Sequence, residues 1–593
     1  IVRLNLNTGE KQHLATPSKE IINYGRPNRN IIFEDKAGVL WMIPHKGNFC
    51  YYDRAEKHLK PFYTDPTNPN SMFTPNVRFY YTDRQKNLWF TGIRGVEKVS
   101  FFPYSYKHTP IDYGLEVRGL WRDKQKRLWV ASKKGTIRIY APDGQLQGYL
   151  NQQGTISKDM VIFPDNIYCF MEDKDGIIWM GGKEKGLFRL EKKDETHFSI
   201  QQFTNQPENK YSLSNNSVYS ICQDSHNRIW IGCFGGGINL LTKSADGKIR
   251  FIHSNNELKN FPTSHFMKVR CITEVSGGVI IAGTTEGLLT FSNNFEQPEE
   301  IKFHQNIRNP GIASSLGSND VINIYTDSRK TIYISTFTGG VSKVLSRNLL
   351  NSDIEFKTYT IRDGLASDLV LSTIEDTEKN LWIVSENTLS RFNPQLETFE
   401  NYGSNFLQQE FNFSEAAPSL NAKQQLVFGT DKGFIEISPS DMKKSDYVPP
   451  IVFTGLKIQG SPSPTGIDDL QELVLNPSQR NITFQFAALD YVAPEEIQYA
   501  YRLEGLEHEW NDADNNRSAS YINLPAGEYR LQVRSTNSDR VWVDNTYFNS
   551  KSIAYFLGNG LGMGTLCRPI YPVYLYHRIY PILYLPLKTS GRP

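Results

Sequence analysis

Hydrophobic and polar residues alternate along most of the chain in short runs that recur with a regular period. The repeated pattern is a V-x-x-I-x-x-D strand, a polar turn, a hydrophobic–Trp–hydrophobic triplet and a short loop that ends in Gly. Successive copies are 40 to 53 residues apart, a period typical of β-propeller blades. Clear copies are centred on Trp41, Trp89, Trp129, Trp179, Trp230 and Trp382, and degenerate copies place Ile280, Tyr333 and Phe428 at the Trp position.

An acidic residue precedes the Trp position by six residues in eight of the nine copies: Asp35, Asp83, Asp123, Asp173, Asp224, Glu274, Asp327 and Asp376. We predict that these acids cap tight turns by accepting hydrogen bonds from nearby backbone N–H groups. The Trp is predicted to wedge against the neighbouring blade. One acid per blade places these residues far apart on a ring, which disfavours a shared role in metal binding or acid catalysis.

The copies divide the chain into domains. Residues 112–438 hold seven copies, enough for one closed propeller, and residues 1–111 hold two copies, which we interpret as the C-terminal blades of a truncated first propeller. After Ser438 the pattern changes to strictly alternating runs such as ITFQF and YRLQV, which predict an immunoglobulin-like β-sandwich over 446–545. The predicted fold class is therefore all-β: a seven-bladed β-propeller, preceded by a partial propeller and followed by the sandwich.

The last segment, residues 548–593, does not continue this order. It is rich in Tyr, Pro and Leu, and prolines interrupt every apolar run. We predict an aberrant or unstructured tail, which an out-of-frame reading across a membrane segment would produce.

Composition and motifs exclude several classes of function. Lys and Arg total 65 against 63 Asp and Glu, so we expect no direct nucleic-acid contact. No uninterrupted apolar run reaches the length of about 18 residues that a membrane-spanning helix needs. The sequence contains none of four common catalytic or cofactor motifs: a Gly-rich phosphate loop, HExxH, GxSxG and CxxC. We therefore expect no catalytic residues, no cofactor and no metal. Six cysteines without metal-ligand spacing are predicted to be small buried thiols: Cys50, Cys169, Cys222, Cys233, Cys271 and Cys567.

Propeller ligands usually bind on the face built by the loops that enter the first strand and the loops that join the second strand to the third. Aromatic faces stack on sugar rings, and Lys binds hydroxyl or acidic sugar groups. Each such residue also has the simpler interpretation of a solvated loop side chain. The candidate ligand-binding residues in the second set of loops are Lys133, Lys134, Lys183, Lys185, Phe234, Phe337 and Lys432.

The chain resembles the periplasmic sensor region of Bacteroidetes-type hybrid two-component systems. In the propeller, the resemblance is carried by the blades, by the segments YSLSNNSVYSICQD and IRDGLASDLVLSTIED, and by QQEFNFSEAAP before LVFGTDKGF. In the sandwich it is carried by Tyr499, Tyr501, the LEG of 503–505, Trp510, Tyr521 and the PAGEY of 525–529. It covers residues 1 to about 545 as regulator-propeller repeats followed by a Tyr-rich Y_Y_Y domain.

The resemblance implies a periplasmic, non-catalytic sensor that detects oligosaccharides and controls polysaccharide-utilisation genes. It implies a parent protein that is a histidine kinase, a homodimer and membrane-anchored through segments expected outside this chain. Two other functions stay open. A propeller-type glycoside hydrolase or polysaccharide lyase would need paired carboxylates or a His/Tyr/Arg group on one face, and a protein-interaction scaffold would need neither.

Overall fold

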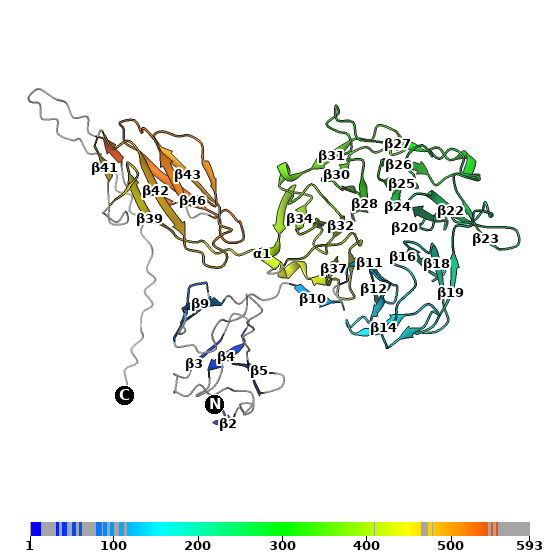
Figure 1. The fold of residues 1–593 in the computed structure, drawn as a ribbon, viewed down its shortest axis with the longest axis horizontal. Coiled ribbons are helices and arrows are strands. Elements are labelled where there is room, and N and C mark those ends of the chain that lie inside the picture. The colour runs from blue at the N-terminus through cyan, green and yellow to red at the C-terminus, as the bar shows by residue number, and fades with distance from the viewer. Residues whose placement is uncertain are drawn as a thin grey trace, which may run out of the picture. The chain divides into compact units, whose positions relative to one another are not determined.

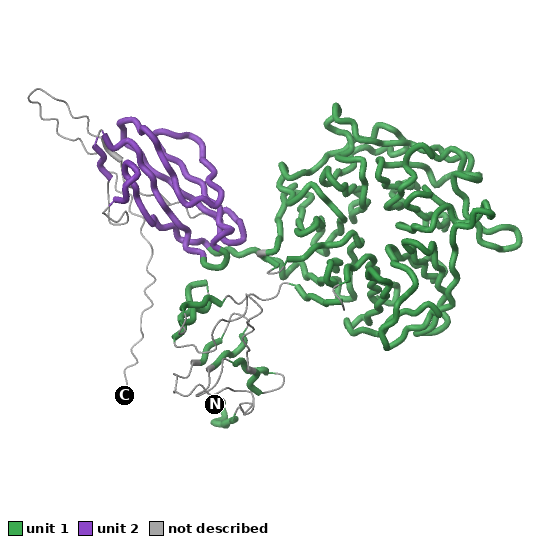
Figure 2. The backbone as a smooth tube through the Cα atoms, viewed as in Figure 1, with its two compact units in different colours: residues 1–447, 491–493 green, residues 448–490, 494–593 purple. Residues whose placement is uncertain are grey.

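The computed structural model of the protein describes residues 2–13, 31–34, 38–43, 50–54, 58–61, 79–85, 87–91, 95–99, 106–111, 115–407, 410–463, 473–476, 478–543, 547–548 and 553–555. Regular structure in these residues is almost entirely β-strand, and the four-residue α1 (Ser404–Leu407) is their one α-helix. The all-β prediction is confirmed. The chain divides into two compact units, residues 1–447 with 491–493 and residues 448–490 with 494–593 (Figure 2).

Seven antiparallel sheets follow one another along the described residues from 106 to 437, and Figure 1 shows them arranged around a common centre as a β-propeller. The first strands of successive sheets lie nearest that centre. The first four sheets contain β11 (Val117–Arg122), β12 (Leu128–Ser132), β13 (Ile137–Tyr140), β14 (Leu146–Leu150) and β15 (Ile156–Ser157); β16 (Ile167–Glu172), β17 (Ile178–Gly182), β18 (Leu187–Lys192) and β19 (Phe198–Phe203); β20 (Val218–Gln223), β21 (Ile229–Cys233), β22 (Gly237–Lys243) and β23 (Ile249–Ile252); β24 (Val269–Val275), β25 (Val279–Thr284), β26 (Gly287–Ser292) and β27 (His304–Asn306).

The remaining three sheets have the same strand order. They contain β28 (Val321–Thr326), β29 (Ile332–Thr336), β30 (Val341–Val344) and β31 (Phe356–Tyr359); β32 (Ser372–Glu375), β33 (Leu381–Val384), β34 (Leu389–Asn393) and β35 (Thr398–Tyr402); and β36 (Ser419–Leu420), β37 (Leu426–Thr430), β38 (Gly433–Ile437) and β10 (Tyr106–Pro110).

The last of these sheets joins two distant parts of the chain. Strand β10 pairs antiparallel with β38, from Tyr106 opposite Ile437 to Pro110 opposite Gly433. Gly433 has φ 139°, and a Cβ there would lie 2.3 Å from the carbonyl oxygen of Thr109, so the close approach of the two strands requires glycine. The sequence-based boundary at residue 112 left β10 out of the propeller, because an outer strand carries no copy of the V-x-x-I-x-x-D pattern.

The repeated Asp accepts two kinds of hydrogen bond. Asp224 Oδ1 accepts from the backbone N–H groups of His226 and Arg228, which confirms the predicted turn cap. Its Oδ2 accepts from the indole Nε1–H of Trp230 at 3.0 Å, a contact that the sequence analysis did not anticipate. The same indole contact recurs in the pairs Asp83–Trp89, Asp123–Trp129, Asp173–Trp179 and Asp376–Trp382. Asp35 lies outside the described residues.

Packing between neighbouring sheets involves the Trp. Trp129 and Ala131 of β12 lie in one buried cluster with Ile178 and Met180 of β17 in the next sheet. The prediction that the Trp wedges against the neighbouring blade is confirmed for this pair. Because strand residues alternate between the two faces, the residues on either side of Trp179 and of Trp230 pack against the preceding sheet instead.

Two degenerate copies are displaced by one residue from their predicted register. Ile281, not Ile280, packs against Ile332 and Ile334 of the following sheet, whereas Ile280 lies with Trp230 of the preceding one. Val427 likewise takes the place predicted for Phe428. The triplets around these positions are apolar throughout, so they do not distinguish the two faces, and a slip of one residue exchanges them.

The displaced register gives Glu274 a different role from the one predicted. Val275 occupies the place of the capping Asp, and Glu274 accepts from the backbone N–H and the hydroxyl of Ser225 in the preceding sheet, both at 2.6 Å. In the last sheet Asn421 occupies the capping place, accepting from the N–H groups of Lys423 and Gln425. An acid six residues before the predicted Trp position therefore caps the turn only in those copies whose strand register in the structure agrees with the predicted one.

The N-terminal residues that the structure describes also form sheets. These are β1 (Val2–Leu4) with β2 (Lys11–His13); β3 (Ile31–Glu34), β4 (Leu40–Ile43), β5 (Cys50–Asp53) and β6 (His58–Pro61); and β7 (Phe79–Thr82), β8 (Leu88–Thr91) and β9 (Val96–Val99). The second and third sheets contain the copies centred on Trp41 and Trp89.

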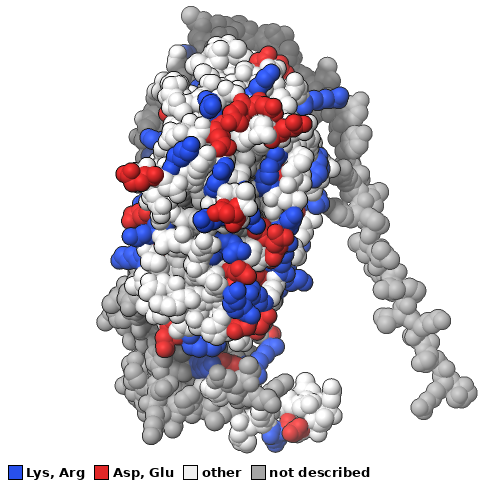
Figure 3. Space-filling view, turned by 90° about the vertical axis from the view of Figure 1, so that its right-hand side faces the viewer, with Lys and Arg blue, Asp and Glu red and all other residues white. Residues whose placement is uncertain are grey.

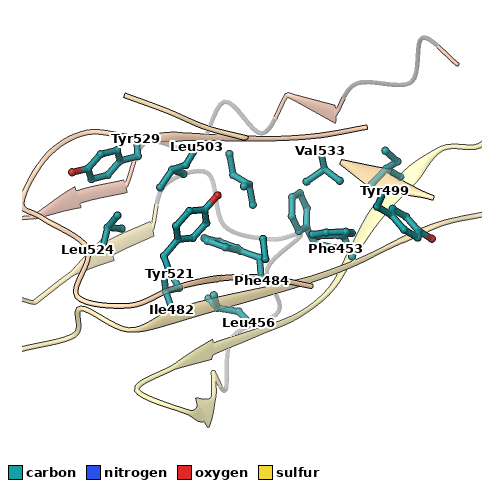
Figure 4. Packing of buried hydrophobic residues seen from close by; sticks show 14 of the residues in the cluster. Phe453, Leu456, Ile482, Phe484, Tyr499, Leu503, Tyr521, Leu524, Tyr529 and Val533 are labelled. Atoms are coloured by element: carbon teal, nitrogen blue, oxygen red, sulfur yellow. The ribbon is translucent and has the colours of Figure 1, made fainter. Parts of the chain in front are cut away.

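The second unit is a β-sandwich with a core of its own. One sheet has the order β40 (Ser461–Pro462), β39 (Ile451–Ile458), β42 (Ile482–Ala488), β45 (Ser518–Tyr521), and the other β44 (Asn511–Asp514), β43 (Tyr499–Glu504), β46 (Arg530–Ser535), β47 (Tyr547–Phe548). Alternate residues of both sheets face inward, including Phe453, Phe484, Tyr499 and Val533 (Figure 4). The alternation in ITFQF and YRLQV thus reflects one buried and one exposed face.

Two short strands fall in or next to the segment predicted to be aberrant. Tyr547–Phe548 pairs with β46, and β48 (Ile553–Tyr555) pairs in parallel with β41 (Leu473–Leu475). The rest of 548–593, with Cys567, lies outside the described residues. No helix in the described part of the chain is long and apolar enough to span a membrane.

Candidate ligand site of the propeller

A β-bulge occurs at the same place in the first strand of five successive sheets. In each, the register shifts across one residue that has no partner on the second strand. A bulge turns the unpaired side chain away from the ordinary alternation and often adjoins a functional site. The bulged residues are Arg118, Tyr168, Tyr219, Arg270 and Ile322.

The aromatic members of this set contact one another from sheet to sheet. The rings of Tyr168 and Tyr219 meet edge to face at 4.9 Å, and Tyr219 stacks on Phe234 at 4.9 Å with 22° between the ring planes. The Arg118 guanidinium lies 5.4 Å from the centre of the Tyr168 ring, and Arg270 lies 5.6 Å from that of Phe234. Three aromatic rings therefore lie between two guanidinium groups across four neighbouring sheets.

Carboxylates from three different sheets surround the two arginines. Arg270 Nε and Nη2 donate to the two oxygens of Asp320 at 3.0 and 3.3 Å. Arg118 Nε lies 3.0 Å from Glu116 Oε1. Glu415, from the segment before β36, lies within ion-pair distance of both guanidinium groups. We call Arg118, Tyr168, Tyr219, Phe234, Arg270 and Glu415 the bulge cluster.

The tyrosines of the bulge cluster are weak acids in this setting. Burial is the largest cause that raises the pKa of Tyr168 and of Tyr219 above the ordinary value. Both hydroxyl groups therefore stay protonated at neutral pH and can donate hydrogen bonds. They are poorly suited to act as a catalytic base.

Four of the sequence-predicted candidates occupy one equivalent position. Lys133, Lys183, Phe234 and Phe337 each follow the second strand of a sheet directly. Each donates its backbone N–H to the residue that precedes the first strand, namely Glu116, Asn166, Ser217 and Asp320 respectively. The second-to-third loops therefore lie beside the beginnings of the first strands, at the same end of the sheets as the bulges.

The side chains at this position differ in how closely they approach the bulge cluster. Phe234 belongs to it, Lys133 forms an ion pair with Glu116, and the charge of Lys183 acts on Tyr219. The Phe337 ring is 36% exposed, and its backbone is bonded to Asp320, the partner of Arg270. Phe337 is therefore a partly exposed aromatic residue whose backbone lies at the edge of the site.

The other three candidates lie farther along their loops. Lys134, Lys185 and Lys432 are exposed, and the structure places none of these side chains in the bulge cluster. Lys134 has φ 65°, and the backbone of Lys185 is hydrogen-bonded to Asp165. The backbone N–H of Lys432 is bonded to Thr430 within its own loop.

The arginines and tyrosines of the cluster are not among the residues predicted from the sequence. Their one signal is the residue after the Val or Ile that begins the first strand, which is Arg, Tyr, Tyr and Arg in four successive copies. In a regular strand these side chains would pack between neighbouring sheets. The pattern therefore indicates a shared site only when the position of the bulge is known.

The wider surface of the ring lacks a single-sign charge pattern in the view of Figure 3, where basic and acidic side chains are interspersed. Among the described residues, no three His, Cys, Asp or Glu side chains are placed to bind a metal together. The prediction of small buried thiols is confirmed for Cys50 and Cys233, whereas Cys169, Cys222 and Cys271 are half-buried. Burial raises the pKa of the Cys233 thiol to about 12, so it is an inert packing group.

Two family models match the chain. The model described as "Two component regulator propeller" matches residues 162–184 and 212–235, which span β16 with β17, and β20 with β21. The model described as "Y_Y_Y domain" matches residues 490–550, the second half of the sandwich. This chain carries regulator-propeller repeats and a Y_Y_Y domain.

Among curated proteins, the regulator-propeller chain is 23% identical over 394 residues to "Histidine kinase P4" of Formosa agariphila. The match covers 64% of this chain and 24% of that protein, so the chain spans about a quarter of its relative's length. These findings agree with the sensor region of a hybrid two-component system.

Solved structures show a similar fold. The extracellular domain of a B. thetaiotaomicron protein described as a hybrid two-component system is 17% identical, with coverage of 94% of this chain and 71% of that one and a TM-score of 0.44. A Staphylococcus aureus virginiamycin B lyase is 13% identical, with coverage of 56% and 98% and a TM-score of 0.41. At these values we transfer no function from either structure.

Proposed function

We propose that this chain is the ligand-sensing region of a hybrid histidine kinase and that it binds an oligosaccharide at the bulge cluster without cleaving it. The observation that carries the proposal is the placement of the five bulges: the fold presents Arg, Tyr, Tyr and Arg side by side at one end of the sheets, next to Phe234 and the exposed ring of Phe337. Aromatic faces with a few fixed polar groups are the usual lining of a small-ligand site. Protonated tyrosines and guanidinium groups supply donors for sugar hydroxyls.

Several wider features belong to the same proposal. The copies within 1–111 are the last blades of a first propeller, residues 112–438 with β10 form the seven-bladed second propeller, and 446–545 transmits the signal. The parent protein is a membrane-anchored homodimer whose sensor lies in the periplasm and controls polysaccharide-utilisation genes. The family models and the relatedness to a histidine kinase support this arrangement.

An enzymatic role remains the alternative because three carboxylates, two tyrosines and two arginines share the site. Two of the carboxylates are engaged with guanidinium groups at 3.0 Å, Glu116 with Arg118 and Asp320 with Arg270. The third, Glu415, lies farther away, at 3.4 Å from Arg118 and 4.0 Å from Arg270. A hydrolase needs one carboxylic acid free to donate a proton beside a second carboxylate. The ion pairs and the raised tyrosine pKa values favour binding over catalysis.

Calorimetric titration with a panel of polysaccharide digests, followed by chromatography of the sugars, tests the proposal. We expect saturable binding with no shortening of the sugar, and binding weakened at least about tenfold by Phe337→Ala, which removes the stacking face. Leu396→Ala is the matched control, since Leu396 is 72% exposed in the turn between β34 and β35, at the other end of the sheets. The proposal would be refuted if neither substitution changed the affinity. It would also be refuted if the chromatogram contained shortened sugars.

A further inference from the structure

Each of the two arginines of the bulge cluster faces a carboxylate, Glu116 directly before the strand of Arg118 and Asp320 before the first strand of the sheet that follows Arg270. Asp320 binds Nε and Nη2 of Arg270, and Glu116 faces Nε of Arg118. Both side chains are mostly buried, with 17% of Arg118 and 18% of Arg270 exposed. The two hydrogen bonds from Asp320 hold the Arg270 guanidinium in one direction, whereas Arg118 Nε is 3.0 Å from Glu116 without forming a hydrogen bond.

Both Nη1 atoms face the same oxygen. Glu415 Oε2 lies 3.4 Å from Arg118 Nη1 and 4.0 Å from Arg270 Nη1. Charge-assisted N–H···O bonds have lengths of about 2.7–2.9 Å, so Glu415 satisfies neither guanidinium well. Its side chain is 37% exposed, and an ion pair this open contributes little.

The surroundings favour an anion over a neutral group. Three lysines add positive charge to the site: Lys133 pairs with Glu116, the charge of Lys183 acts on Tyr219, and Lys268 lies 5.7 Å from the centre of the Phe234 ring. With the two arginines, the site therefore holds five cationic groups and the three carboxylates of Glu116, Asp320 and Glu415. If Glu415 turns toward solvent, the site has a larger excess of positive charge around its two guanidinium groups.

We propose that the ligand carries an oxyanion group, the carboxylate of a uronic acid or a sulfate ester, and that this group replaces Glu415 between Arg118 and Arg270. The inference rests on the proposed oligosaccharide site and names the class of sugar it takes. Glu415 acts as an internal stand-in for the ligand anion, which neutralises the arginines while the site is empty and competes with the ligand for them.

The test compares three sets of probes of equal chain length with the full chain: cello-oligosaccharides as neutral sugars, oligogalacturonides as uronates and carrageenan oligosaccharides as sulfate esters. Affinities are measured by calorimetry at two salt concentrations. We expect one acidic set to bind at least about tenfold more tightly than the neutral set, and to weaken as salt rises. The acidic set that binds identifies the oxyanion.

Glu415→Gln is the decisive variant because it removes the competing charge and keeps the size of a side chain that is 37% exposed. We expect it to tighten acidic-sugar binding about tenfold and to leave neutral-sugar binding unchanged. Glu184→Gln is the matched control: it removes one negative charge from an exposed loop at the same end of the sheets and contacts neither arginine. It should change acidic-sugar binding less than about twofold.

The outcomes separate this inference from the function on which it rests. The acidic-ligand inference would be overturned if neutral sugars bound as tightly as acidic ones, or if Glu415→Gln and Glu184→Gln had the same effect on acidic-sugar affinity. Either result would leave the oligosaccharide site itself intact. If neither the three probe sets nor the digest panel binds, the proposed function itself fails, and this inference fails with it.

Discussion

The Asp–Trp pair is the residue-scale unit of the propeller. Asp224 connects the turn between β20 and β21 to the indole of Trp230, which is fully buried. The sequence predicted the cap because Asp in a polar turn has few other roles. It could not predict the indole bond, since that depends on the Trp side chain folding back over its own hairpin.

Replacing Asp224 with Ala should therefore destabilise the ring by about 2 kcal/mol or more, because the buried indole N–H of Trp230 and the turn amides lose their acceptor. Urea unfolding followed by Trp fluorescence measures the effect. Asp246→Ala, at an exposed turn, is the control and should stay within about 0.5 kcal/mol of the parent. Equal stability of the two variants would show that the pair is not structural.

A second residue-scale prediction concerns acid sensitivity. His253 is buried after β23, its Nδ1 accepts from the N–H of Asn255 at 3.2 Å, and burial is the main cause that lowers its pKa below 6.5. The unfolded chain therefore binds the proton more readily than the folded chain. The stability due to neutral His253 is complete above about pH 6.5 and is lost as pH falls toward the lower folded pKa.

His253→Gln removes this titration. We expect the melting temperature of the parent to fall more steeply than that of the variant between pH 7.5 and 5, measured by circular dichroism in one buffer series. The other histidines are common to both chains and cancel in the difference. Parallel curves would mean that His253 does not couple folding to pH.

At the scale of the elements, strand alternation was sufficient to predict most strands, whereas bulges and outer strands were not predictable. Arg118 and Tyr219 read as ordinary alternating residues, because the sequence does not show where a partner strand skips a position. The one-residue displacements at Ile280 and Phe428 have the same origin: a fully apolar triplet allows either face. The loop candidates could therefore be named from the sequence, whereas the strand residues of the bulge cluster could not.

Closure by β10 gives an element-scale prediction. Tyr106 donates its hydroxyl to the carbonyl of Leu407 at 2.6 Å and packs edge to face on Phe411. Tyr106→Ala should lower the free energy of unfolding of the ring by about 2 kcal/mol. Its neighbour Lys107, whose side chain is 64% exposed in an ion pair with Glu436, is the control, and Lys107→Ala should cost about 0.5 kcal/mol or less. Equal costs would argue against closure by this strand.

At the scale of the whole molecule, the sequence predicted the order of the parts because each part has its own periodicity. The period of 40–53 residues ends where the propeller ends, and strict alternation begins with the sandwich, whose buried cluster is separate from those of the ring. The exact beginning of the propeller was not predictable in this way, since β10 pairs with a strand more than 300 residues later.

The central claim is that an oligosaccharide binds at the bulge cluster and is not cleaved. The most direct test is hydrogen–deuterium exchange of the full chain, measured with and without the fraction of a polysaccharide digest that binds. Chromatography of the sugar is carried out on the same samples. We predict slower exchange in peptides that contain the beginnings of β11, β16, β20 and β24, unchanged exchange in the Asp turns at their other ends, and sugars of unchanged length. Protection confined to the turns or the sandwich, or the appearance of shorter sugars, would contradict the account.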